Sequence, residues 1–267
     1  MEPETKISEK SRWIALFVLC LGALMIVLDT TIVNVALPSI RLSLGFSEAS
    51  LAWVVNAYIL TFGGFLLLGG RLGDLFGHRK LFLTGITIFT LASLLCGIAS
   101  TQWFLIVARA VQGVGGAIVA AVALSLIMNL FTEPASRAKA MGVYGFVSAG
   151  GGSLGVLLGG LLTGALNWHY IFLVNLPIGI GVFILSLIFL SGEKNEHVSK
   201  GLDIAGAITI TSSLMLAIYA IVNGNTAGWV SFQTVGLLLA AIVLMISFIF
   251  IEKKVASPLI PIGLFRS

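Results

Sequence analysis

Long runs of apolar residues, separated by short polar stretches, divide the chain into eight segments. Each run has about the 20 residues that a helix needs to cross the hydrocarbon core of a bilayer. The regular alternation of apolar and polar residues that marks membrane β-barrels is absent. The pattern predicts an all-α integral membrane protein with spans at 13–36, 51–70, 81–100, 103–130, 140–162, 170–190, 204–222 and 233–251.

Polar and helix-breaking residues separate these runs. The first break is predicted at Pro38, and the second at a charged loop over residues 71–80. A longer polar stretch follows the sixth run and predicts a linker. The expected organisation is an N-terminal tail 1–12, a six-helix unit 13–190, a linker 191–203, two further helices 204–251 and a tail 252–267.

The composition narrows the class of protein. Hydrophobic residues make up 58% of the 267 residues and charged residues 10%, whereas a soluble domain carries about 25% charged residues. This excludes a soluble globular enzyme and a disordered chain. No nucleophile–base pairing, phosphate-binding loop or metal-ligand spacing of cysteine and histidine is visible, so we expect no enzyme activity, no metal and no cofactor.

The positions of lysine and arginine predict the orientation. Arg41 falls on the outer side and Arg109 within the fourth span, and the other 13 of the 15 basic residues share the side of the N-terminus. Positive residues concentrate on the cytoplasmic side of membrane proteins. We therefore expect a multi-pass protein of the cell membrane, with both termini cytoplasmic and with no nucleic-acid partner, despite the net charge of +4.

Two charged residues lie well inside predicted spans, where charges are costly and usually functional. Asp29 in the first span is either a structural hydrogen-bonding group or a carboxyl group that faces a cavity and binds and releases a proton. Arg109 in the fourth span stays charged, so we expect it to hold a carboxylate, polar groups or water inside the bundle.

The stretch between the second and third spans contains glycines that permit a tight turn, one acidic residue and basic residues. It reads GxLxDxxG followed by a basic pair, which resembles the loop signature of the major facilitator superfamily. That resemblance implies a cytoplasmic gating loop. Its predicted residues are Gly70, Gly73, Asp74, Gly77 and Arg79, while Leu75 and His78 stand where the family has basic residues.

Further motifs resemble the fourteen-span drug:proton antiporter branch of that superfamily. They are LDTTIVNVALP at 28–38, WVVNAY at 53–58, LxxxRxxQGxGGA at 105–117 and WHYIFLVNLPIG at 168–179. The resemblance implies proton-coupled efflux of hydrophobic or cationic small molecules, with Asp29 and Arg109 as the proton-coupling pair. The same fold also carries uptake symporters, which stay an alternative.

Small residues in the fourth and fifth spans predict close helix packing. The helix-packing residues are Gln112, Gly113, Gly151, Gly155, Gly159 and Gly160. The fifth span resembles the antiporter motif of the branch, except that Val156 stands where the family has proline. A simple packing seam explains the same glycines without antiport.

The branch has two six-helix halves with two helices between them, and residues 252–267 resemble the stretch before the second half. We therefore interpret the chain as the N-terminal half plus the two linking helices. It is expected to be a fragment or truncated product, or a half that needs a partner chain and does not transport alone. The expected partners are membrane lipid, a small-molecule substrate, protons, and a second half or another copy of the chain.

Overall fold

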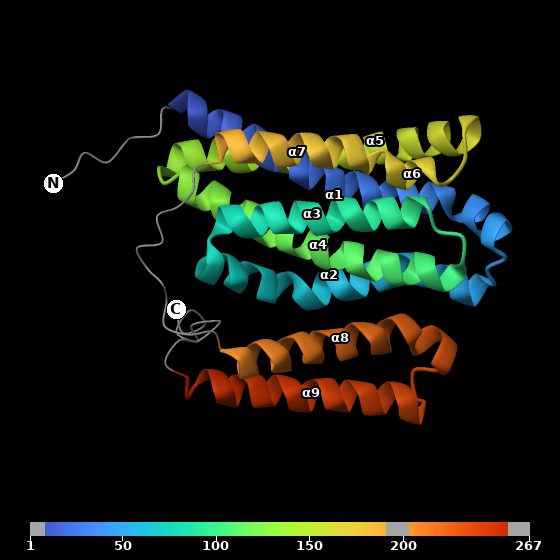
Figure 1. Cartoon of the computed structure of the whole chain (residues 1–267). Coiled ribbons are helices and arrows are strands. Elements are labelled where there is room, and N and C mark those ends of the chain that lie inside the picture. The colour runs from blue at the N-terminus through green and yellow to red at the C-terminus, as the bar shows by residue number, and fades with distance from the viewer. Residues whose placement is uncertain (1–8, 191–202, 256–267) are drawn as a thin grey trace.

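The computed structural model describes residues 9–190 and 203–255. This part of the chain is all-helical and has eight helical segments long and apolar enough to cross a membrane, which confirms the predicted fold class (Figure 1). The predicted linker, apart from Asp203, and most of the predicted C-terminal tail lie outside the described residues. The helices are α1 (Glu9–Leu44), α2 (Glu48–Phe76), α3 (His78–Gly97), α4 (Gln102–Leu130), α5 (Pro134–Ala165), α6 (Tyr170–Leu173), α7 (Asn175–Phe189), α8 (Ile204–Ala227) and α9 (Phe232–Glu252).

Several helices begin before the apolar runs do, because polar residues cap them. The Ser47 hydroxyl accepts a hydrogen bond from the backbone N–H of Ser50 at 3.1 Å, at the start of α2. Thr101 caps α4 and Ser231 caps α9 in the same way. Such caps satisfy backbone N–H groups that have no partner within the helix. α5 begins at Pro134, where a missing N–H costs nothing.

One predicted break is misplaced, and another is shorter than predicted. Pro38 does not end the first helix, because α1 continues through it to Leu44 and buries Ile40 on the far side. The charged stretch 71–80 is not a loop, since α2 runs to Phe76 and α3 begins at His78. The only residue between them is Gly77, whose φ of 90° is readily adopted by glycine alone. Its N–H bonds the Gly73 carbonyl at 2.9 Å and its carbonyl accepts from Leu81 at 3.1 Å.

The sixth span consists of two helices. α6 ends at Leu173 and α7 begins at Asn175, with Val174 between them. Pro177 explains the break, because it lacks the N–H that would bond the Leu173 carbonyl, and its ring crowds that carbonyl.

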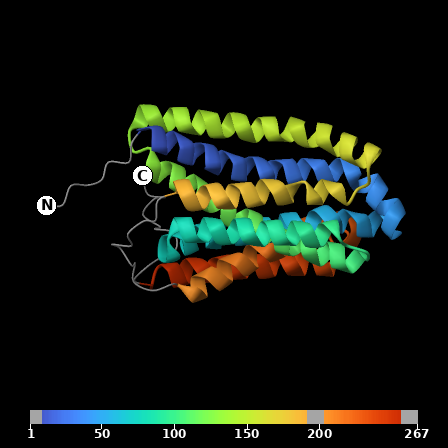
Figure 2. The same ribbon diagram turned by 45° about the horizontal axis from the view of Figure 1, so that its top comes forward.

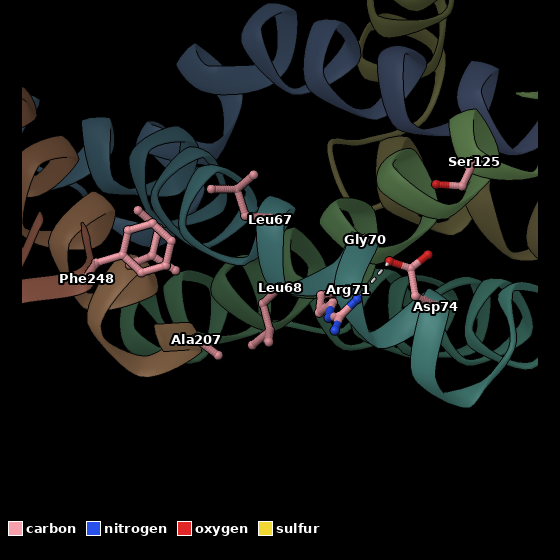
Figure 3. Close-up of a pocket in the computed structure, with 9 residues that line it drawn as sticks. Leu67, Leu68, Gly70, Arg71, Asp74, Ser125, Ala207 and Phe248 are labelled. Carbon is pink, nitrogen blue, oxygen red and sulfur yellow. Dashed lines mark ion pairs between the residues drawn. The ribbon is translucent and has the colours of Figure 1, made fainter. Parts of the chain in front are cut away.

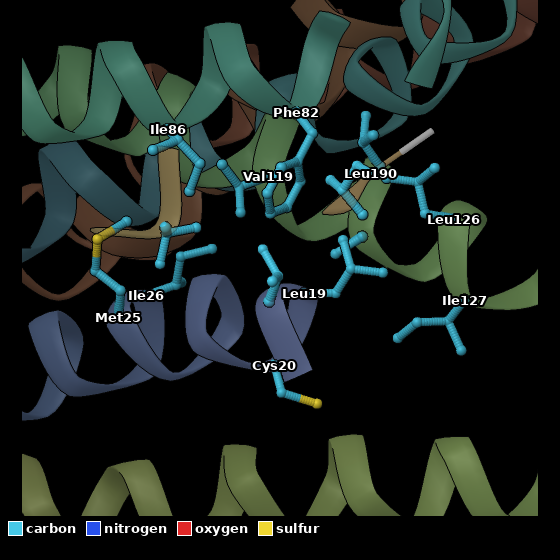
Figure 4. Packing of buried hydrophobic residues seen from close by; sticks show 14 of the residues in the cluster. Leu19, Cys20, Met25, Ile26, Phe82, Ile86, Val119, Leu126, Ile127 and Leu190 are labelled. Atoms are coloured by element: carbon cyan, nitrogen blue, oxygen red, sulfur yellow. The ribbon is translucent and has the colours of Figure 1, made fainter. Parts of the chain in front are cut away.

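The first seven helices form one bundle in which α1 and α4 contact several neighbours (Figures 1 and 2). α2 and α3 lie along α4, α5 lies along α1, and α7 contacts both α1 and α3. Figure 4 shows the larger apolar core, which includes Leu19 and Met25 of α1, Phe82 of α3 and Val119 of α4. A second core, which includes Ile32, packs around the other half of α1.

α8 and α9 form a hairpin that lies beside α2 (Figure 1). The Ser213 hydroxyl donates to the Ala241 carbonyl at 2.8 Å and ties the two helices together. Met215 and Ile218 of α8 lie against Gly64 and Gly63 of α2, where a larger side chain would overlap them. The hairpin is therefore seated on α2 through small residues.

Candidate functional site

Asp29 of α1 and Arg109 of α4 form an ion pair inside the bundle. Arg109 Nη1 donates to Asp29 Oδ2 at 2.6 Å, and the two residues are 1% and 0% exposed. They are separated by 80 residues in the sequence. Removing two charges from water is costly unless they are paired and hydrogen-bonded, and here they are both.

Two amide side chains complete the surroundings of the carboxylate. Gln112 Nε2 donates to Asp29 Oδ1 at 2.8 Å, and Asn175 Nδ2 donates to the same oxygen at 3.0 Å. Asp29 therefore accepts from three side chains on two other helices, α4 and α7. The Asp29 side chain is 0% exposed and lies among these polar groups.

The guanidinium of Arg109 is held from several sides. Its Nε donates to the carbonyl of Val54 on α2 at 3.0 Å, and its Nη1 also donates to Gln112 Oε1 at 2.7 Å. The guanidinium carbon lies 4.3 Å from the ring centre of Tyr58 and 5.8 Å from that of Phe172. Aromatic faces attract a cation. Arg109 therefore does hold a carboxylate and polar groups inside the bundle.

The break between α6 and α7 places Asn175 in this cluster. Asn175 is the first residue of α7, and it also donates to the hydroxyl of Ser93 on α3 at 3.0 Å. Ser93 in turn donates to the carbonyl of Phe172 at 2.9 Å. The polar cluster, defined as Asp29, Arg109, Gln112, Asn175 and Ser93, thus connects α1, α3, α4 and α7.

Three of these five residues make contacts that were not predicted from the sequence. Gln112 was expected to pack helices, but it is a fully buried hydrogen-bonding partner of Asp29. Asn175 and Ser93 were given no role. A signal did exist for Asn175, since it is the only amide residue in the predicted span 170–190 and lies two positions before Pro177.

The glycines of α4 lie against two neighbours. A methyl group at Gly113 would overlap Thr61 of α2, whose hydroxyl donates to the Ala110 carbonyl at 2.7 Å. A methyl group at Gly115 would approach the backbone of Phe89 on α3 at 2.6 Å. These positions let α2 and α3 approach the segment of α4 that carries Arg109.

The glycine stripe of α5 lies against α1. A methyl group at Gly155 would overlap Thr31, whereas methyl groups at Gly151 and Gly159 would come no nearer than 3.0 Å to their neighbours, which are Leu24, Val27, Ile32 and Val35. Gly160 was expected to belong to this packing motif, but a methyl group there meets nothing within 4 Å among the described residues. Gly160 lies next to the stripe in the sequence and therefore faces another direction on the helix.

The predicted gating residues lie where α2 and α3 meet. Asp74 is 3.3 Å from His78 Nε2 and 3.7 Å from Arg71 Nη1. Asp74 and Arg71 face a pocket of about 230 Å³ that α8 and α9 help to close, as Figure 3 shows. Gly70 is among the lining residues, and Gly73 lies against His78. Arg79 turns away from this pocket to the carbonyl of Leu187 on α7.

The chemistry available in the polar cluster is electrostatic and acid–base. Asp29 is the only carboxyl group in it, and Arg109 supplies a fixed positive charge beside it. Within residues 9–190 and 203–255, no three His, Cys, Asp or Glu side chains gather in a way that could hold a metal ion.

Comparison with known proteins places the chain among transporters. The profile of the Major Facilitator Superfamily matches residues 19–263. The puromycin resistance protein of Streptomyces alboniger is 43% identical over 94% of this chain and 50% of its own length. The cephamycin export protein of Amycolatopsis lactamdurans is 41% identical over 94% of this chain and 52% of its own. Multidrug resistance protein 3 of Bacillus subtilis is 37% identical, with 93% and 48% covered.

Solved structures show the same fold. The human organic anion transporter MFSD10 superposes with a TM-score of 0.63 at 18% identity, over 77% of this chain and 55% of that one. An occupied, inward-facing bacterial homologue of the lysosomal transporter Spinster gives 0.59 at 19% identity, over 94% and 63%. The chain spans about half the length of the curated relatives it matches. The chain is a multi-pass membrane protein that belongs to the Major Facilitator Superfamily, a family of transporters and not of enzymes.

Proposed function

We propose that the chain forms part of a proton-coupled exporter of hydrophobic or cationic small molecules, in which Asp29 binds the proton. The observation that carries this proposal is the fully buried Asp29, which Arg109, Gln112 and Asn175 contact. Charged groups inside a membrane span are rare and usually functional.

Proton binding at Asp29 would weaken the electrostatic interaction that stabilises Arg109 inside the bundle. A protonated Asp29 is neutral, so the buried guanidinium would lose its counter-charge. An unpaired buried charge is destabilising by about 3–5 kcal/mol. The free energy supplied by proton binding can thus favour a different arrangement of α1 against α4. In transporters of this fold, such a change rocks two halves about a site near the midplane.

The proposed gate is the cytoplasmic end of α2 and α3. Asp74 lies with Arg71 and His78 at the junction of the two helices, and α8 and α9 cover the adjoining pocket (Figure 3). Rearranging this group of charges would change how α2 meets its neighbours at that end. We place this end in the cytoplasm of the cell on the basis of its basic residues.

The proposed substrate class rests on the relatives and on one pocket. The relatives are named for puromycin resistance, cephamycin export and multidrug resistance. A pocket of about 730 Å³ between α2, α4 and α8 is lined by Trp53, Trp103 and Tyr219, and none of the described residues that line it is charged. Aromatic lining of this kind suits apolar molecules, and it also attracts cations through the ring faces.

The test of this proposal is dye export by a full-length version of the protein in proteoliposomes with an imposed proton gradient. Asp29→Asn should abolish proton-driven movement of a cationic dye. Glu48→Gln is the matched control, since Glu48 is an exposed carboxylate paired with Arg41 at 3.1 Å. Export by Asp29→Asn at the unmodified rate would remove Asp29 from the mechanism. Uptake down the same gradient would indicate a symporter.

A second candidate is a membrane half that does not transport without a partner. Its supporting observation is that the chain spans about half the length of the curated relatives. The 267-residue chain, reconstituted alone under the same gradient, should then insert but move no dye above the background of empty liposomes. Dye movement that Asp29→Asn abolishes would exclude this candidate and show that copies of the chain assemble into a transporter.

A further inference from the structure

Asn175 holds an unused hydrogen-bond acceptor next to Asp29. Its side chain is fully buried, and its Nδ2 donates both to Asp29 Oδ1 and to Ser93 Oγ at 3.0 Å. Its Oδ1 has no hydrogen-bond partner within the described part of the chain. Buried carbonyl groups are nearly always paired, so an unpaired one at a functional site needs an explanation.

The arrangement around Asp29 fits only the ionised carboxylate. Arg109, Gln112 and Asn175 all donate to it, and an ionised carboxylate only accepts. A protonated Asp29 would carry an O–H group that needs an acceptor. Arg109 offers none, and Gln112 Oε1 already accepts from Arg109 Nη1 at 2.7 Å and from the Cys96 thiol at 3.7 Å. The amide oxygen of Asn175 is the acceptor that remains.

We propose that Asn175 is a positioning residue whose side-chain amide turns over when Asp29 takes up a proton. The inference rests on the proposed function, because it requires that Asp29 binds protons. A hydronium ion gives its proton to an Asp29 oxygen, so that one O–H bond of the ion breaks, a water molecule is left and one O–H bond forms at the carboxyl group. Rotation about the Cβ–Cγ bond of Asn175 then presents Oδ1 to the new hydroxyl in place of Nδ2. In the structure Oδ1 of Asn175 has no partner, and after the rotation Nδ2 would take its place. The number of unpaired amide atoms is therefore the same in both orientations, so the rotation itself costs little free energy.

Rotation of the Asn175 amide would also change the hydrogen bonding of α6. Before the rotation, as in the structure, Nδ2 of Asn175 donates to Ser93 Oγ, and the Ser93 hydroxyl donates to the Phe172 carbonyl at 2.9 Å. Once Oδ1 replaces Nδ2, the Ser93 hydroxyl can donate to that oxygen only by leaving Phe172. Phe172 belongs to α6 and lies two residues before the break at Val174. Protonation of a residue on α1 would therefore exchange a hydrogen bond that ties α6 to α3.

Few other charged or titratable groups lie around Asp29 in the described part of the chain. Arg109 faces it from α4, while Tyr58 on α2 and Cys96 on α3 lie within range of its charge. α5 meets this part of α1 through Gly155 and brings no ionisable group there. Asp29 is thus the only carboxyl group among the described residues in these surroundings.

Infrared difference spectra of the full chain in lipid, acidic minus alkaline, test the proposal. Acidification should produce a carboxyl C=O band that is absent in Asp29→Asn. In Asn175→Leu the band should move to the higher frequency of an acid that donates no hydrogen bond. Asn34→Leu, at an exposed asparagine of α1, should leave the band in place. An unmoved band in Asn175→Leu would overturn the proposal.

A second measurement leaves the sequence at position 175 unchanged, in case Asn175→Leu does not fold. With asparagine labelled by ¹³C and ¹⁵N in the side chain, acidification should shift an amide band, and the shift should be lost in Asp29→Asn. An Asp29 carboxyl band without an accompanying asparagine shift would overturn this inference alone. The absence of any Asp29 band would overturn the proposed proton site as well.

Discussion

Arg79 Nη2 donates a hydrogen bond to the carbonyl of Leu187 at 2.7 Å, across 108 residues of sequence. Leu187 lies in the last turn of α7, where carbonyl groups have no partner within the helix. A basic side chain at this end also interacts favourably with the helix dipole. Arg79 therefore ties the start of α3 to the end of the six-helix unit, whatever its part in gating.

Replacing Arg79 by alanine should lower stability by about 1 kcal/mol, because the bond to Leu187 is partly exposed to solvent. Arg79→Lys should lie between, since lysine keeps the charge but has a different donor geometry. The measurement is the unfolding midpoint in detergent. Lys80→Ala, at the exposed neighbouring cation, is the control. Equal losses in Arg79→Ala and Lys80→Ala would show that the bond contributes nothing specific.

Breaking the ion pair of Asp29 and Arg109 from one side should be costly. Asp29→Leu and Arg109→Leu should each reduce the free energy of unfolding by about 3–5 kcal/mol, because each leaves a buried partner uncompensated. The double variant should lose much less than the sum of the two. A double-mutant cycle of unfolding free energies in detergent measures this coupling. Additive losses would contradict the pairing.

Gly155 and Gly160 should respond oppositely to alanine. Gly155→Ala should destabilise the chain by about 1–3 kcal/mol, because the added methyl group overlaps Thr31 and pushes α5 away from α1. Gly160→Ala meets no neighbour among the described residues, and alanine favours the helix. It should be neutral or slightly stabilising. Thermal unfolding of the two variants side by side is the measurement, and equal destabilisation would refute the assigned seam.

Cysteine labelling in intact cells should reveal the orientation predicted from the basic residues. Reagents that cannot cross the membrane should label cysteines placed at positions 45 and 225 from outside, and not those placed at 137 and 198. The two native cysteines are buried and should contribute little background. Labelling of positions 137 and 225 from the same side would show that the predicted topology is wrong.

The number and order of the spans could be predicted from the sequence, because the bilayer requires long apolar runs wherever a chain crosses it. The ends of the helices were harder to predict. At Pro38 the apolar contacts of α1 on both sides outweigh one lost hydrogen bond, so the helix continues. At Pro177 the chain breaks instead, and Asn175 enters the polar cluster. Local sequence contains proline in both cases and does not distinguish the outcomes.

Only the charged residues of the site could be predicted from the sequence. Asp29 and Arg109 are recognisable because a charge in a span is costly, yet their contact depends on how α1 packs against α4. Gln112 looked like part of a packing motif, since it precedes Gly113. Its bond to Asp29, like that of Asn175, joins residues more than 80 positions apart. Such partners follow from the tertiary arrangement and not from spacing along one helix.

The single-residue junction at Gly77 has a mechanical consequence. Its N–H closes the last turn of α2 and its carbonyl opens the first turn of α3. One intervening residue lets the Cα atoms of Phe76 and His78 lie no more than about 7 Å apart. The two helices therefore have no slack at this end, and neither can slide along its axis independently. Any tilt of α2 must therefore move the start of α3 with it, and the angle between the two helices can change only at Gly77.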